Sequence, residues 1–166
     1  MKNLLKNISL SLISVFLMSQ ARAETQLSNC DKDEEIFYSC GTGKKVISFC
    51  ASPKGSSSGY LEYRFGLPQK IELRYIVTKQ DSSKIFNRAE VLGASNASTV
   101  IWFENNGINY ALNDPVKGDT VMEVIKNEKT ISRLTCKKDF QGDTAAASNF
   151  IEEKDQKAFF KLHGHE

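Results

Sequence analysis

The fold is decided by the stretch STVIWFENNGINYAL, residues 98–112, in which two short strand-like runs flank the turn dipeptide Asn106-Gly107. Asparagine and glycine tolerate the positive φ angles that a tight hairpin turn requires. The stretch therefore predicts a β-hairpin. Trp102 and Phe103 are adjacent within one strand, so we expect their side chains on opposite faces of the sheet, one of them in the core.

The same pattern repeats on both sides of this hairpin. Paired strand-like runs occupy residues 36–40 with 45–50, 60–65 with 71–77, and 120–126 with 130–136. Residues 85–92 fit either a strand or a short helix. About seven or eight short strands separated by turn residues predict a mainly β domain, either an antiparallel β-sandwich or a barrel.

The C-terminal residues 139–166 differ from the rest of the chain. Apolar residues recur at near-helical spacing between Phe150 and Leu162, with charged residues between them. This predicts a C-terminal helix with Asp143 near its cap, which would cover part of the sheet. The alternative is a tail that frays. The expected organisation is a leader over 1–23, a β domain over 24–138 and the helical tail.

The leader has the order of parts found in a secretory signal peptide. Lys2 and Lys6 precede an apolar run over residues 8–18, and Ala21-Arg22-Ala23 follows as a cleavage site. A membrane anchor would need about 20 apolar residues, so it is the less favoured interpretation. We therefore expect cleavage after Ala23, a periplasmic or secreted protein, and no membrane span after cleavage.

The charge balance argues against nucleic acid as a partner. The chain has 22 basic and 20 acidic residues, but three of the basic residues lie in the leader, and the remainder carries 19 against 20. Binding to phosphates needs a clustered basic face, which this balance does not indicate.

All four cysteines, Cys30, Cys40, Cys50 and Cys136, follow the leader, and export favours two disulfides. Spacings of ten, ten and 86 residues do not resemble zinc-binding pairs. Strand parity in the first hairpin places Cys40 on the core face with Ile36, and Cys50 on the other face with Phe37. This favours Cys40 with Cys136 and Cys30 with Cys50, although all three possible connectivities stay open.

Catalytic motifs are scarce. The two histidines, His163 and His165, lie near the terminus, where a desolvated pocket is hard to build. The acids over residues 31–35 and 152–153 are typical of a solvated face, and glycoside hydrolysis would need two acids held across a cleft. We therefore expect a protein that is not an enzyme and that has no metal or cofactor.

A binding role is the alternative. Residues 52–59 form a polar loop rich in serine and glycine that contains Lys54, and Tyr60, Tyr63 and Arg64 follow it directly. Hydrogen-bond donors beside aromatic anchors suit an acidic, sugar-shaped cleft. The competing interpretation is a solvated connection next to half-buried tyrosines.

The runs over residues 38–45, 50–52, 59–66 and 134–136 resemble a family of small exported proteobacterial proteins of uncharacterised function. Ser58-Gly59-Tyr60 is also similar to the loop of the periplasmic lysozyme inhibitors, small disulfide-bonded β proteins that block a glycosidase cleft with a Ser-Gly motif and a nearby Tyr. In those inhibitors further residues separate the glycine from the tyrosine, and they are absent here. The resemblance implies that Ser58 would bond the catalytic acids, Tyr60 would fill the cleft, and Lys54 or Arg64 would oppose its negative charge.

Two classes of function follow from these observations. The first is an exported protein that occludes a lysozyme or another peptidoglycan hydrolase, as an inhibitor or immunity protein. The second is a structural or accessory domain of the cell envelope with no enzyme target. The sequence does not indicate an oligomeric state.

Overall fold

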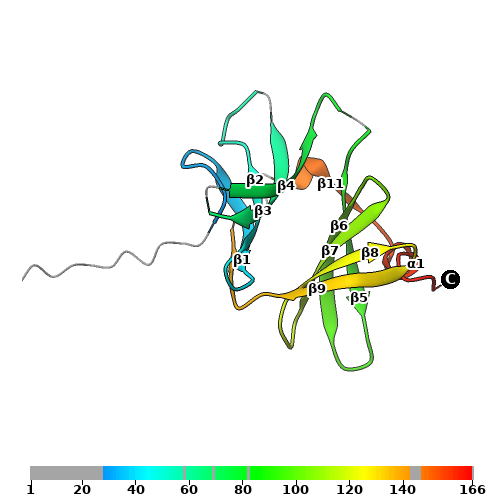
Figure 1. Cartoon of the computed structure of the whole chain (residues 1–166). Coiled ribbons are helices and arrows are strands. Elements are labelled where there is room, and N and C mark those ends of the chain that lie inside the picture. Colours follow the sequence, from blue (N-terminus) through cyan, green and yellow to red (C-terminus); the bar gives the residue numbers. More distant parts are fainter. Residues whose placement is uncertain (1–27, 58, 69, 82, 143–146, 166) are drawn as a thin grey trace, which may run out of the picture.

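The computed structural model describes residues 28–57, 59–68, 70–81, 83–142 and 147–165, so the expected leader lies outside the described residues. The described part is a β-sandwich whose two sheets form separate layers (Figure 1). The first sheet contains β1 (Glu35–Gly41), β2 (Val46–Ala51), β3 (Tyr60–Leu67), β4 (Lys70–Thr78) and β10 (Lys138–Gln141). The second contains β5 (Phe86–Leu92), β6 (Ala97–Asn105), β7 (Ile108–Pro115), β8 (Val121–Lys126), β9 (Lys129–Thr135) and β11 (Ile151–Glu153).

The strands follow one another mostly as antiparallel hairpins. The order is β10-β1-β2-β3-β4 in the first sheet and β11-β5-β6-β7-β8-β9 in the second, and among the strands of the described residues only β11 pairs in parallel, with β5. The predicted hairpin over 98–112 is confirmed, with Asn106 and Gly107 at φ angles of 55° and 73°. Of the ambiguous residues 85–92, residues 86–92 form strand β5. Of the two expected architectures, the sandwich is the one present.

The core between the sheets is aromatic. Tyr63 of β3 and Tyr75 of β4 contact Phe103 of β6 with ring centroids 4.9 and 4.3 Å apart. Phe86 and Phe49 complete this cluster and are fully buried. Burying a large side chain stabilises a fold by about 1.5–3 kcal/mol, so this cluster contributes much of the energy that holds the two sheets together.

Both expected disulfides are present, Cys30–Cys50 and Cys40–Cys136, and the second ties the first strand to the residue after β9. The face assignment near the start of β1 was wrong, because a β-bulge lies between Ile36 and Tyr38. The bulge turns Phe37 into the core and pairs Ile36 with Cys50. Cys40 is beyond the bulge, so its predicted core position holds.

The C-terminal residues contribute more strand and less helix than the sequence indicates. β10 crosses the expected boundary at residues 138–139, and β11 extends the second sheet. The helix α1 (Gln156–Lys161) is capped by Asp155, whose side chain accepts a hydrogen bond from the amide of Lys157; Asp143 lies outside the described residues. The helix is short because residues 151–153 satisfy their backbone groups at the edge of β5 instead.

Helix α1 covers the outer face of the second sheet, as expected for the tail (Figure 1). Phe159 lies 6.1 Å from Trp102, measured between ring centroids, and leaves Trp102 only 5% exposed. Phe103, its neighbour, lies in the core. The adjacent aromatic residues therefore point to opposite faces, and both are buried.

Candidate functional site

The loop between β2 and β3, residues 52–59, rises from a fixed base. The amide of Ser52 donates to the carbonyl of Tyr60 at 3.0 Å, and the amide of Tyr60 donates to Oγ of Ser52 at 3.3 Å. Cys50, two residues before the loop, is held in a disulfide. The loop therefore starts and ends at positions whose backbone is fixed by several bonds.

The described residues at the tip of this loop, 53–57, are exposed. The amide of Ser56 donates to the carbonyl of Pro53 at 3.1 Å, which folds the tip into a turn. Behind the tip, Gly59 is buried, and a Cβ added there would lie 3.0 Å from the ring of Phe150. Close approach to this ring explains a glycine at position 59.

A groove of about 290 Å³ lies between the loop and two other parts of the chain, the end of β4 and the 3-10 turn η1 (Ser148–Phe150). Its described lining residues are Ser52, Pro53, Lys54, Gly55, Ser56, Gly59, Lys79, Asn149 and Phe150. Two of these are lysines and none is acidic. Lys54 is 72% exposed, and its Nζ lies 3.8 Å from a carboxylate oxygen of Glu35. Glu35 does not line the groove. The groove therefore favours a negatively charged group.

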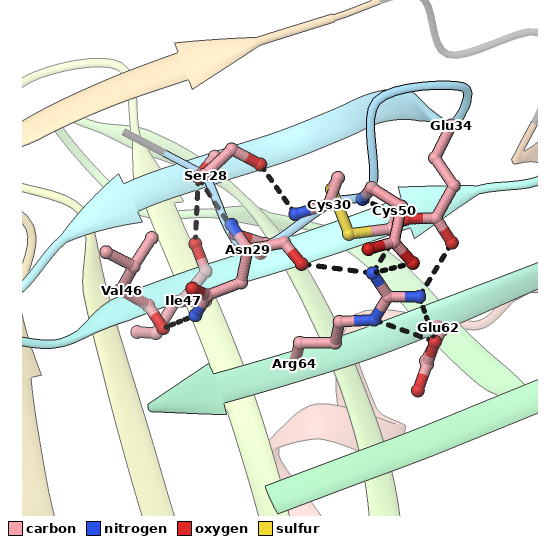
Figure 2. Close-up of a disulfide and its surroundings, with 12 residues drawn as sticks. Ser28, Asn29, Cys30, Glu34, Val46, Ile47, Cys50, Glu62 and Arg64 are labelled. Atoms are coloured by element: carbon pink, nitrogen blue, oxygen red, sulfur yellow. Dashed lines mark hydrogen bonds and ion pairs between the residues drawn. A yellow bond between two sulfur atoms is a disulfide. The ribbon is translucent and has the colours of Figure 1, made fainter. Parts of the chain in front are cut away.

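Arg64 does not belong to this groove. Its side chain is 4% exposed and lies on the outer face of the first sheet, beneath the residues that precede β1 (Figure 2). The guanidinium lies 2.6 Å from Glu34 and 2.5 Å from Glu62, and 3.4 Å from Asp31. Its charge is thus balanced within the chain, and the expected role of Arg64 against a partner's negative charge does not fit its position.

The acids around Arg64 form a buried network. The side chains of Glu34 and Glu62 are 4% and 7% exposed, so the expectation of a solvated acidic face before β1 fails for Glu34. Burial disfavours the charge on Arg64, but hydrogen bonds to Glu62 and Glu34 outweigh it, and the pKa of Arg64 is raised. The guanidinium of Arg64 therefore stays charged.

Tyr60 is joined to the same network. Its hydroxyl donates to Oε1 of Glu34 at 2.5 Å. Burial, the hydrogen bond to Glu34 and the negative charge of Glu34 raise the pKa of Tyr60 to about 12. The hydroxyl is thus engaged in holding the base of the loop, and it is not aimed at the groove.

Residues 28–34 act as a strap over this face of the sheet. Asn29 donates from its amide to Oγ of Ser48 and from its side chain to the carbonyl of Val46. Figure 2 shows the Cys30–Cys50 disulfide beside the guanidinium of Arg64. The strap therefore seals the polar outer face and connects it to the base of the loop.

The structure brings together only part of the predicted site. Lys54 and Gly59 line the groove, and Tyr60 holds the base of the loop. Arg64 is buried elsewhere, and Ser58 lies outside the described residues. Sequence reasoning missed Lys79, although pairing of Tyr60 with Thr78 in the predicted hairpin places residue 79 beside the loop. Phe150 belongs to the C-terminal segment, which is distant in sequence from the loop. No sequence pattern near Gly59 or near Phe150 indicates that they are in contact.

The one group of possible metal ligands found among the described residues consists of Cys30 and Glu34 of the strap and Cys50 of β2. Both sulfur atoms are joined in the disulfide, so neither is a thiolate, and Glu34 is already bonded to Arg64. This group therefore serves to hold the strap.

Comparisons of the chain with protein-family models, with curated proteins and with solved structures found no match. Within the described residues, no helix has the length and apolar character needed to cross a bilayer. The two disulfides fit an extracellular or periplasmic protein, because disulfides persist in oxidising compartments.

Proposed function

We propose that this chain is an exported binding protein, without catalytic activity, that occludes the acidic cleft of a peptidoglycan hydrolase with the loop over residues 52–59. The proposal rests on one observation. The groove beside the loop is lined by Lys54 and Lys79 and, among its described residues, by no acid. Hydrolases of this class work with paired carboxylates across a cleft, which such a surface complements.

The fixed base of the loop supports this role. A loop that is already ordered loses less conformational freedom when it binds, so more of the contact energy appears as affinity. Here the two hydrogen bonds between Ser52 and Tyr60, the bond from Tyr60 to Glu34 and the Cys30–Cys50 disulfide hold both ends of the loop. The exposed tip, residues 53–57, would enter the cleft.

The residue roles differ from those that the lysozyme-inhibitor resemblance implies. Lys54 and Lys79 replace Arg64 as the charges that face the partner. Tyr60 becomes a positioning residue, because its hydroxyl bonds Glu34. Backbone amides and hydroxyls of the loop tip would donate to the catalytic carboxylates.

Binding can be tested by immobilising the chain from Glu24 onward and passing a panel of lysozymes and other peptidoglycan hydrolases over it. We expect a hydrolase that binds in the nanomolar range. Reversing both charges, Lys54→Glu with Lys79→Glu, should weaken that binding by about 100-fold or more, as for central interface residues. The matched control is Lys117→Glu, an exposed lysine in the loop after β7.

Failure of every hydrolase to bind would contradict the proposal, and so would binding that survives the double reversal. Either result would favour an accessory domain of the envelope without an enzyme target. Equal losses in the double variant and in the Lys117→Glu control would also contradict it, because general charge rather than this groove would then set the affinity.

A further inference from the structure

The inward face of the second sheet changes from apolar to polar at one row of residues that are paired across β5, β6 and β7. On β6, Phe103 and Ile101 point into the core, and Thr99 follows them on the same face. The residues paired with Thr99 are Glu90 on β5 and Asp114 on β7. Polar side chains at inward positions of a sandwich depart from the pattern that builds its core, and such departures are found at functional sites.

A cavity of about 430 Å³ opens at this level, between the end of the first sheet and the second. Its apolar lining comes from Phe37, Tyr38, Ile101, Leu112 and Ile151, and its polar lining from Arg88, Thr99, Asp114, Ser148 and Glu153. Ligand sites usually measure about 300–1,000 Å³ and combine an apolar wall with a few polar groups. The described residues that line the loop groove do not line this cavity.

Among the described lining residues, the polar side of the cavity carries more acid than base. Arg88 lies between two carboxylates, 2.6 Å from Glu90 and 3.0 Å from Glu153. Asp114 adds a further acid to the lining and accepts a hydrogen bond from Thr120 at 2.6 Å. Because the one guanidinium faces two carboxylates already, the cluster attracts a cation more than an anion.

Water and ligands can reach this cluster. The side chains of Arg88 and Glu153 are 38% and 64% exposed, so a ligand need not break a buried ion pair. Ile101 and Leu112, in contrast, are buried at the floor. A molecule that fits both environments has a charged end and an apolar body.

We propose that this cavity binds an organic cation with an apolar body, a class represented by the arylalkylamines. The ammonium group would lie near Glu153 and Asp114, and the apolar body would contact Ile101 and Leu112. This site is independent of the loop groove and does not require a hydrolase partner.

The test uses 2-phenylethylamine and, as a probe of similar shape and opposite charge, 3-phenylpropionate. Both are titrated into the isotopically labelled chain from Glu24 onward, and amide chemical shifts are followed. We expect the amine to move the amides of Ile101 and Leu112 in a saturable way, with the carboxylate binding about tenfold more weakly. Glu153→Gln should lower the affinity for the amine about fivefold, as loss of one nearby charge in a solvated setting does.

The control variant is Glu152→Gln, because Glu152 is the neighbouring residue on β11, pairs with Lys154 and does not line the cavity. It should bind the amine as the unmodified protein does. Equal binding of the two probes, no saturable shift with the amine, or equal losses in the two variants would overturn the proposal. The choice between amine and carboxylate is measured on the unmodified chain, so the test does not depend on the folding of a variant.

Discussion

Nη2 of Arg64 lies 2.6 Å from Oε1 of Glu34, and this contact joins strand β3 to the strap that precedes β1. Both side chains are 4% exposed, so water cannot solvate either charge when its partner is removed. The pair connects the sealed outer face of the first sheet to the base of the loop, since Glu34 also accepts a hydrogen bond from the hydroxyl of Tyr60.

Replacing Arg64 should therefore be costly. In Arg64→Met the carboxylate of Glu34 stays buried without its cation and Glu62 keeps only Arg74, so we expect a loss of about 3–5 kcal/mol in the free energy of unfolding. Arg74 is the matched control, because it bonds the same Glu62 from a side chain that is 55% exposed. Arg74→Met should cost less than about 1 kcal/mol. Urea unfolding measures both, and equal losses would contradict the buried network.

Burial of the Tyr60 hydroxyl and its bond to Glu34 together predict a loss of stability at high pH. The pKa of Tyr60 is raised from 10 to about 12, which means that the folded state favours the neutral phenol. The stabilisation is fully present below pH 10 and is lost as the pH rises through about 12. Subtracting the phenolate absorbance of Tyr60→Phe from that of the unmodified protein should isolate a titration near pH 12. A difference titration at pH 10 would show that the hydroxyl is neither buried nor held by Glu34.

The two disulfides should differ in their contribution to stability. Cys40–Cys136 joins residues 96 apart, whereas Cys30–Cys50 joins residues 20 apart. On the chain-entropy model these loops contribute about 4.7 and about 3.3 kcal/mol. Paired alanine variants, Cys40→Ala with Cys136→Ala and Cys30→Ala with Cys50→Ala, should lose stability in that order in urea. The reverse order would mean that the strap contributes more than its short loop implies.

The cover over Trp102 can be measured directly, because the chain has a single tryptophan. Phe159→Ala removes the ring that lies 6.1 Å from it, so the fluorescence of Trp102 should shift to longer wavelength. We also expect a loss of about 3–4 kcal/mol in stability, as for truncation of a buried phenylalanine. Lys157→Ala, on an exposed position of the same helix, should change neither. An unchanged spectrum in Phe159→Ala would show that α1 does not cover the sheet.

Local patterns were enough to predict the hairpins, since turn residues such as Asn106-Gly107 and strand periodicity act over a few residues. Strand parity also led to both disulfides, because the bulge in β1 ends before Cys40. It failed for Ile36 and Phe37, where the bulge itself carries no sequence signal. Counting alternate residues from the turn therefore assigns the correct face only to residues between that turn and the bulge.

The candidate site was harder to predict because its environment comes from distant segments. Arg64 has the same charge as Lys54 in the sequence, yet the strap over residues 28–34 buries it against Glu34. The strap has no periodicity, and its position depends on the Cys30–Cys50 disulfide and on hydrogen bonds from Asn29. Phe150 reaches the loop from a segment that looked helical, and its contact with Gly59 depends on tertiary packing alone.

The central claim is that the loop over residues 52–59 blocks a hydrolase. The most direct measurement is the rate of peptidoglycan hydrolysis by several lysozyme types and other peptidoglycan hydrolases, with and without the purified chain from Glu24 onward. We predict that at least one enzyme is inhibited competitively with substrate, and that a variant in which residues 53–57 are replaced by a two-residue turn does not inhibit it. Undiminished hydrolysis by every enzyme, or full inhibition by the loop variant, would contradict the account.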